Sequence, residues 1–375
     1  MVNRRQPTIA AGGPVLSLAL ALFVLGQAGP ATAEVALQGF TGQPQPITTA
    51  SLIPRFSSAE NYYEQYNFEA TLEGGREFYL RLRIANLGPG DGRLEVTTRV
   101  GHPTSGARLR GSAKLKRSEW SYERQSFEIR AGQTRVAGTP EEVQVQGAGS
   151  GFRYDLRFFR LVTGWQPGSG RIGLPGEGYY LTQILFPLAR VEGTIVTGEE
   201  THQVKGTGFA LHSASDVPPY RIARRWVQFD ARDGDTSIYL RHFVPAAGWA
   251  PQPVSFLLVT RGERVVFQSY GVALGAEETS VDAKTAARYV VPRRIRIEAR
   301  APGQVLRGTL DATELYRRSA MLEESGVMER LVIRQVAEPV DYNFRCGYHF
   351  TLESEGAGPL SLTGKATYSV NYLNR

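Results

Sequence analysis

The sequence predicts an all-β fold with few short helices, and two observations lead to this prediction. The chain of 375 residues contains 41 Gly and 21 Pro, about one residue in six, which favours many turns over a helical bundle. Apolar and polar residues alternate along many short segments, which is the period of half-buried strands. With 42% hydrophobic and 21% charged residues, the chain is not wholly disordered. We expect two antiparallel β-barrels or sandwiches in tandem.

We expect residues 1–33 to form a signal peptide that is removed on export. An arginine pair near the N-terminus precedes the apolar segment 14–25, which is too short to span a bilayer comfortably. An Ala-Thr-Ala run then offers a cleavage site after Ala33. No later segment is long and apolar enough to suggest a transmembrane helix, so we expect a periplasmic or secreted protein.

The strand pattern is clearest in the segment 78–84, where Phe78, Leu80 and Leu82 point to one face and Arg81 to the other. Similar alternation, with turn residues between the runs, predicts further strands along the chain. These segments are 94–100, 143–146, 153–160, 238–244, 255–260, 265–270, 294–298 and 342–352.

Two segments do not follow the alternating pattern. Residues 34–57 are rich in Gly and Pro and should form an irregular lead-in. Residues 312–324 place Leu315 and Leu322 seven positions apart before Gly326, which predicts a helix.

A short internal similarity indicates two domains. Residues 198–213 and 358–372 each read as a polar turn followed by a strand with Gly and small residues in its middle. The first is followed by a Pro-Pro link, which places a domain boundary near residue 217. We therefore expect an N-terminal domain over 34–217 and a C-terminal domain over 218–375, each long enough for a closed barrel.

No local motif for catalysis, phosphate binding or metal binding is present. The five His residues lack the local spacing of metal ligands, so we expect no metal and no cofactor. Cys346 is the single cysteine, and strand alternation puts His349 on the opposite face, so a Cys–His pair is not expected.

The formal charge is +7, and only five of the 43 basic residues are Lys. Two interpretations remain open, a bias of the coding sequence or a surface for phosphate or anionic lipid. Outward arginines such as Arg81, Arg83, Arg224 and Arg225 could contact a membrane surface, or could simply be solvated. No basic block is long enough for a nucleic-acid arm, and we expect no nucleic-acid partner.

The most distinctive constellation surrounds His212. Alternation places Gly208 and Ala210 on the face of His212, and such small residues can leave room for a ligand inside a barrel. The alternative is that His212 bonds a loop at the domain junction. Trp226, which follows the junction, could likewise belong either to a core or to a site.

The run GTGFALHSASDVPPYRIARRWVQFDA (206–231) resembles the central signature of the lipocalin-like survival-factor family first described in fungi. The stretch 61–88 resembles the opening hairpin of that family, and 320–352 resembles its closing segment. The family is similar in turn to carotenoid 1,2-hydratases. The resemblance implies two tandem lipocalin-like β domains that handle long-chain hydrophobic molecules, with ceramide transfer in the fungal branch.

The chain departs from the hydratase branch at two places. Aromatic-rich Tyr62–Tyr66 replaces the Glu-Trp-Trp-Tyr of that branch, and 210–213 lacks its acidic and His/Trp residues. Hydration of an alkene needs a buried acid, and the candidate, Asp216, lies in an expected surface link.

We expect a lipocalin-like carrier of a lipid or terpenoid, without catalysis and with no catalytic residues. The alternatives are a hydratase or isomerase acting on a polyene or lipid, and an interaction module whose cavities are filled by side chains. The oligomeric state stays open. The residues expected to line or border the ligand cavity are Tyr66, Phe68, His212, Trp226 and His242.

Overall fold

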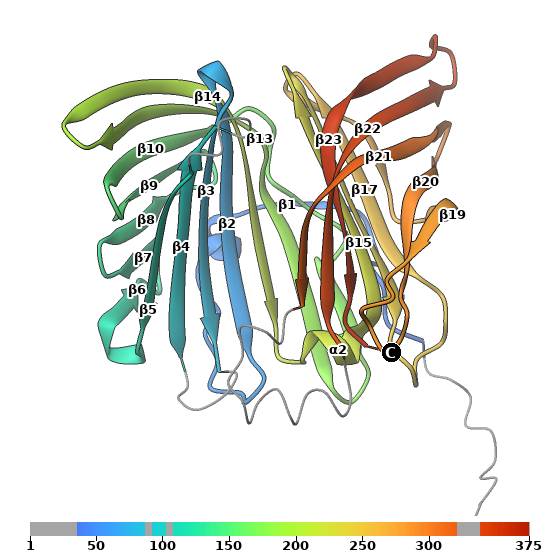
Figure 1. Cartoon of the computed structure of the whole chain (residues 1–375), viewed down its shortest axis with the longest axis horizontal. Helices are drawn as coiled ribbons and strands as arrows, with labels where there is room; N and C mark the ends of the chain where they lie inside the picture. Colours follow the sequence, from blue (N-terminus) through green and yellow to red (C-terminus); the bar gives the residue numbers. More distant parts are fainter. Residues whose placement is uncertain (1–35, 87–91, 103–107, 321–337, 375) are drawn as a thin grey trace, which may run out of the picture. The chain divides into compact units, whose positions relative to one another are not determined.

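The computed structural model describes residues 36–86, 92–102, 108–320 and 338–374, and these residues confirm the all-β prediction. Their strands form two antiparallel sheets, drawn from blue to green-yellow and from yellow to red in Figure 1. The predicted signal segment 1–33 lies outside the described residues. No helix of the described part has the length and apolar character needed to cross a membrane.

The first sheet contains the strands that precede residue 216. The main path runs β5-β4-β3-β2-β14-β13-β10-β9-β8-β7-β6, and β1, β11 and β12 pair beside it. The strands are β1 Gln45–Pro46, β2 Tyr63–Leu72, β3 Arg76–Ala85, β4 Arg93–Gly101, β5 Arg108–Leu115, β6 Trp120–Tyr122, β7 Phe127–Ala131, β8 Thr134–Gly138, β9 Glu142–Gly149, β10 Phe152–Arg160, β11 Trp165–Gln166, β12 Arg171–Leu174, β13 Gly178–Thr197 and β14 Glu200–Ser215. Short helices lie at Thr49–Leu52 (α1), Glu73–Gly75 (η1) and Arg117–Glu119 (η2).

The second sheet follows a four-residue helix, α2 (Pro219–Ile222), and runs β18-β17-β16-β15-β23-β22-β21-β20-β19. The edge strand β18 approaches β20, the neighbour of the other edge strand, since the hydroxyl of Ser269 donates to the carbonyl of Arg300 at 2.7 Å. The strands are β15 Ala223–Asp233, β16 Thr236–Pro245, β17 Val254–Arg261, β18 Arg264–Ser269, β19 Val272–Val281, β20 Val290–Ala301, β21 Gln304–Ala320, β22 Val340–Ser354 and β23 Leu360–Tyr372.

The two similar segments occupy equivalent places. The first becomes β14, which lies between β2 and β13, and the second becomes β23, which lies between β15 and β22. Each therefore pairs with the first long strand of its own sheet. Residues 35–375 nevertheless form one compact unit, and the boundary at 217/218 stays a prediction.

Alternation sets the inner face of each sheet. In β3, Phe78, Leu80, Leu82 and Ile84 are all buried, as the sequence predicted, and they join the apolar cluster inside the first sheet. A second cluster fills the inner face of the other sheet, with Phe229 packed edge-on against Phe350. Both interiors are thus filled by side chains of their own strands.

The prediction of a helix over 312–324 is wrong for residues 312–320, the part that the structure describes. Residues 312–320 continue β21 and pair with β22 across two irregularities, at 312–314 and 315–317. Each bulge inserts a residue, which breaks the two-residue alternation and leaves Leu315 half exposed. The conformation of this segment is set by its pairing with β22, which overrides the helical spacing of its apolar residues. The remainder, 321–324, lies outside the described residues.

A third apolar cluster, which we call the seam, contains side chains from both sheets. It includes Phe209 and Leu211 of β14 together with Tyr239 and Phe243 of β16. Polar contacts accompany it, since the indole of Trp165 donates to the side-chain oxygen of Gln268 at 2.7 Å. The outer face of β14 thus belongs to the seam, while Ala210 belongs to the inner cluster of the first sheet.

Candidate functional site

A buried ion pair joins two neighbouring strands of the first sheet. Glu64 of β2 and His212 of β14 are both fully buried, and the ring nitrogen Nε2 lies 2.7 Å from the carboxylate oxygen Oε1. The antiparallel register sets Tyr66 opposite His212, so alternation along β2 turns Glu64 to the same inner face. The Tyr66 ring stacks on the imidazole with centroids 4.2 Å apart.

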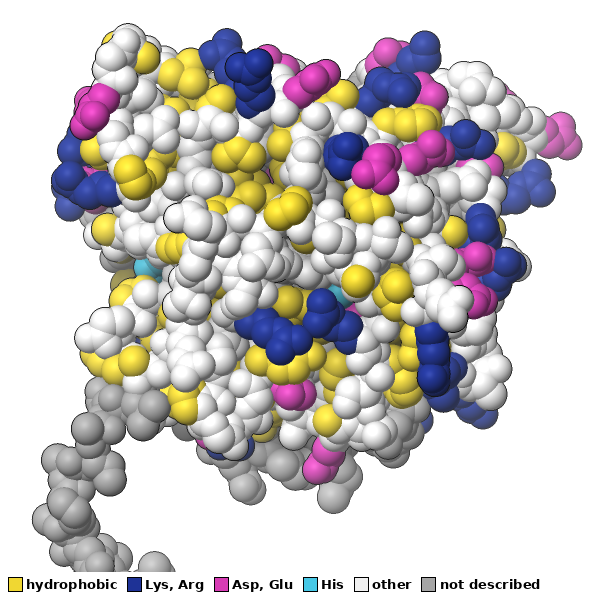
Figure 2. All heavy atoms as spheres, turned by 180° about the vertical axis from the view of Figure 1, so that it is seen from behind, with side chains coloured by type: hydrophobic (Ala, Val, Ile, Leu, Met, Phe, Trp, Pro, Cys, Tyr) yellow, Lys and Arg dark blue, Asp and Glu magenta, His cyan; other side chains and the backbone are white. Residues whose placement is uncertain are grey.

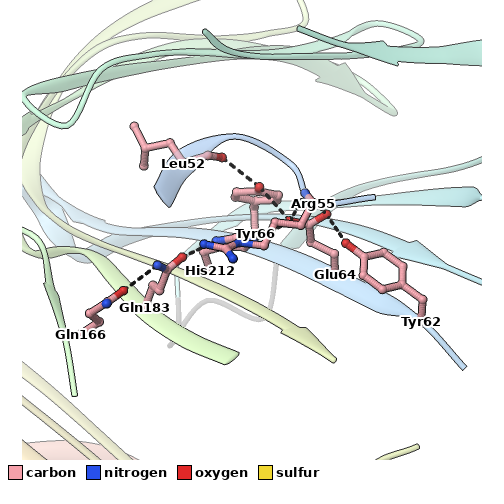
Figure 3. A network of polar contacts seen from close by, with 8 residues as sticks. All are labelled: Leu52, Arg55, Tyr62, Glu64, Tyr66, Gln166, Gln183 and His212. Atoms are coloured by element: carbon pink, nitrogen blue, oxygen red, sulfur yellow. Dashed lines mark hydrogen bonds and ion pairs between the residues drawn. The ribbon is translucent and has the colours of Figure 1, made fainter. Parts of the chain in front are cut away.

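The Glu64 carboxylate is surrounded by donors (Figure 3). The backbone N–H of Arg55, which follows α1, lies 3.0 Å from both oxygens, and the hydroxyl of Tyr62 donates at 2.6 Å. The hydroxyl of Tyr66 lies 3.1 Å from Oε1 and 2.9 Å from the carbonyl of Leu52. Burial alone would raise the pKa of Glu64, but the bond and charge of His212, with Tyr62 and Arg55, lower it below its ordinary value.

The other ring nitrogen of His212 begins a chain of amides (Figure 3). Nδ1 lies 2.9 Å from the oxygen of Gln183, whose nitrogen donates to Gln166 at 2.6 Å. The nitrogen of Gln166 in turn contacts the carbonyl of Gly168 at 3.4 Å. A carbonyl can only accept, so this contact orients both amides and requires Nδ1 to donate. His212 therefore donates from both nitrogens and faces Glu64 as a cation.

This arrangement favours a fixed charge pair over a proton donor. Glu64 is held as a carboxylate, and burial raises the pKa of Tyr62 and of Tyr66 above the ordinary tyrosine value. The described residues contain no group of three or more His, Cys, Asp or Glu that could hold a metal ion.

The five residues expected around one cavity lie in three places. Tyr66, Phe68 and His212 share the inner face of the first sheet. Trp226 packs in the seam against Phe243, with centroids 5.6 Å apart. His242 lies on the inner face of the second sheet, 4% exposed.

His242 differs from His212 in its surroundings. Its Nδ1 is buried and has no hydrogen-bond partner among the described residues. Burial, and then the charge of Arg225, lower the pKa of His242 to about 4. His242 is therefore a neutral imidazole near neutral pH.

Gly208, on the face of His212, lies close to neighbouring side chains. A Cβ on Gly208 would lie 2.5 Å from Val191 and 2.7 Å from Phe158, so this glycine allows close packing. The alternative that His212 bonds a loop is wrong, because Glu64 and Gln183 both lie on strands.

Two hollows on the described surface lie away from these residues. Their volumes are about 430 and 320 Å³. The larger lies at the turns around Gly303 and Glu355, and the smaller at Gly138. Neither touches the five expected ligand residues.

Glu64 is the residue of this buried polar network that the sequence analysis missed. Asp216, the candidate acid, is half-buried and accepts a hydrogen bond from the backbone N–H of Tyr179 at 2.7 Å. Strand alternation could have pointed to Glu64, because it places this acidic residue on the same inward face as Tyr66 and Phe68.

The surface arginines are mostly mixed with acidic residues. Arg83 pairs with Glu95 at 2.6 Å, and Arg81 lies 3.8 Å from the same carboxylate. On the face shown in Figure 2, groups of Lys and Arg lie among Asp and Glu side chains. Arg224 is exposed, whereas Arg225 is half-buried over the Tyr372 ring.

Comparison with known proteins gives matches of two kinds. The chain is 22% identical over 123 residues to a ceramide-binding protein, svf1, of Aspergillus fumigatus, and the alignment covers 30% of each protein. Among solved structures, CghA in complex with Sch210972 has a TM-score of 0.57 at 12% identity, over 91% of this chain and 98% of that one. Kievitone hydratase of Nectria haematococca has a TM-score of 0.52 at 11% identity, over 90% and 98%.

These solved structures show a shared fold, which confirms the lipocalin-like prediction. The model of the Svf1 family matches residues 93–338, about two thirds of the sequence. The resemblance noted in the sequence is therefore confirmed, and the chain belongs to the Svf1 family.

Proposed function

We propose that this protein binds a long-chain lipid of the ceramide type and carries it without chemical conversion. The observation that carries the proposal is membership of the Svf1 family together with the match to a ceramide-binding relative. The structure adds a large apolar cluster rich in aromatic side chains, the seam.

The seam is the place that suits the acyl chains. The interior of the first sheet is packed tightly around Gly208, and that of the second is filled by rings such as Phe229 and Phe350. The seam instead joins surfaces of two sheets, and a ligand can enter it if these surfaces separate slightly. Its apolar members include Phe209, Leu211, Tyr239, Phe243, Phe256 and Leu258.

The state of Glu64 supports binding without turnover. Protonation of an alkene needs an acid that still holds its proton near neutral pH. Glu64 has a lowered pKa and five contacts from donors, so it is a poor proton donor. The network then serves to position polar groups.

The test is native mass spectrometry of the full chain purified without detergent, followed by lipid extraction. We expect a stoichiometric adduct with the mass of a long-chain lipid, unchanged in mass after incubation. Cross-linking with a photoactivatable ceramide should label peptides that contain Phe243 or Phe256. Protein that is repeatedly free of lipid, and that fails to bind added ceramide, would exclude the carrier function.

A hydratase is the second candidate, because kievitone hydratase of Nectria haematococca shares the fold of this chain. The Glu64–His212 pair is the place to test it, since it is a buried carboxylate beside a histidine. Incubation with long-chain polyenes should give products 18 mass units heavier. Loss of that product in both Glu64→Gln and His212→Gln, with retained lipid binding, would establish the enzyme and overturn the carrier proposal.

We also propose export, on the basis of residues 1–33. The test is cell fractionation with N-terminal sequencing of the mature protein. A mature chain that begins at Glu34 in the periplasm or medium is the expected result. Retention of the intact N-terminus in the cytoplasm would contradict it.

A further inference from the structure

Two arginines lie at the seam with opposite charge surroundings. Arg232 of β15 contacts two carboxylates, Glu69 at 2.7 Å and Asp230 at 3.0 Å. Arg241 of the neighbouring β16 forms no ion pair with a carboxylate of the described residues, and its side-chain hydrogen bonds go to Tyr239, Tyr180 and Gln228.

The contacts of Arg241 are all neutral. Its Nε donates to the hydroxyl of Tyr239 at 2.7 Å, and Nη2 donates to the amide oxygen of Gln228 at 3.1 Å. Its Nη1 donates to the hydroxyl of Tyr180. Burial raises the pKa of Tyr239, so that hydroxyl stays neutral. The guanidinium is thus hydrogen-bonded but keeps a positive charge without a counter-ion in the described structure.

Arg241 is half-buried beside the apolar seam, and an anion that reaches its guanidinium would supply the carboxylate or phosphate partner that the described residues do not. Three of the five N–H groups of Arg241 are used by the contacts above, which leaves two in this part of the structure. A planar guanidinium is well suited to bind carboxylate or phosphate oxygens through paired donors.

Apolar rings continue from this cation into the seam. The Tyr180 ring packs edge-on against Phe243 at 5.4 Å. The Tyr239 ring lies 5.0 Å from Phe209 and 5.8 Å from Phe256. A charged group therefore stands at one side of an aromatic surface, as an amphiphile with an acidic head and a long chain requires.

We propose that Arg241 binds the anionic oxygen headgroup of a long-chain lipid whose hydrocarbon chain lies in the seam. The inference rests on the proposed binding of a long-chain lipid, and it assigns the headgroup as an acid, a carboxylate or a phosphate monoester, which a neutral ceramide lacks. Tyr180, Tyr239 and Gln228 position the guanidinium, and Phe243 and Phe256 contact the chain.

The test measures binding of three lipids of equal chain length to the full chain by tryptophan fluorescence: oleate, oleyl phosphate and methyl oleate. The wild type should bind at least one of the acids about ten-fold or more tightly than the ester. The ratio between the two acids identifies the headgroup.

Arg241→Gln should remove the preference for the acid, so that the variant binds acid and ester with similar affinity. The matched control is Arg224→Gln, which neutralises an exposed arginine on the adjacent strand and should behave as wild type.

Arg241→Lys provides a second variant, because it keeps the charge and should keep part of the preference even if Arg241→Gln unfolds. Equal binding of acid and ester by the wild type would overturn this inference and leave lipid binding intact. An unchanged preference in Arg241→Gln would also overturn it. Failure of all three lipids to bind would overturn the inference, while the ceramide cross-linking described above tests the proposed function separately.

Discussion

Replacing Glu64 by Gln keeps the size of the side chain and removes its charge. The carboxylate accepts contacts from Arg55, Tyr62, Tyr66 and His212, all inside the first sheet. The amide has one acceptor oxygen, and its NH₂ would face donors that need acceptors. Removing one partner of a buried ion pair costs about 3–5 kcal/mol, and we expect the variant to lose that much unfolding free energy.

The assay is guanidinium unfolding at pH 7, followed by tryptophan fluorescence. The control is Glu141→Gln, which removes an exposed pair with Arg160 at 3.0 Å and should cost under about 1 kcal/mol. The double variant Glu64→Gln/His212→Gln should lose less than the sum of the single variants, because it leaves no unpaired charge. A loss below about 1 kcal/mol in Glu64→Gln would refute the reasoning.

The Glu64–His212 pair also predicts that the unfolding free energy falls in acid. The pKa of Glu64 is lower in the folded state than in the unfolded chain, so the unfolded chain takes up the proton first. The contribution of Glu64 is present above about pH 4.5 and is lost as pH falls through its folded-state pKa. The Glu64→Gln variant should lack this part of the acid transition.

Two further predictions concern the inner faces of the sheets. Gly208→Ala should lose about 1–3 kcal/mol of unfolding free energy, because its Cβ would meet Phe158 and Val191. The control is Gly347→Ala, which has open space around it and should change little. Equal melting temperatures of the two variants would contradict the packing argument. The pKa of His242 falls from 6.5 to about 4 on folding, so the unfolded chain binds the proton first, and stability should fall by about 3 kcal/mol as pH drops from 6.5 towards 4. Urea unfolding across this range checks it, and a slope in His242→Gln as steep as that of the wild type would exclude His242 as its source.

The local features of the fold, the strands and their buried faces, could be predicted from the sequence. The alternation around Phe78 and Leu80 predicts both the strand and its buried face, because each follows from the side-chain period of a strand. The bulged strand around Leu315 was missed, since its pairing with β22 depends on residues about 30 positions away.

The site was predicted in part for the same reason. His212 could be found because small residues precede it on its own strand. Its partner Glu64 lies 148 residues earlier, and only the pairing of β2 with β14 brings the two together. Local patterns in the sequence do not predict a contact between residues so far apart, so the ion pair could be found only from the structure.

The two polar centres of the molecule have different consequences for a ligand. The Glu64–His212 pair is complete, with its charges matched and its donors used, so an incoming molecule gains little there unless it displaces an existing bond. Arg241 lacks a counter-ion among the described residues, and an acidic ligand would supply one at the point where the apolar seam begins. A ligand that binds only the folded chain stabilises it by an amount that grows with its affinity, so an acid seated at Arg241 should also raise the unfolding free energy of the chain.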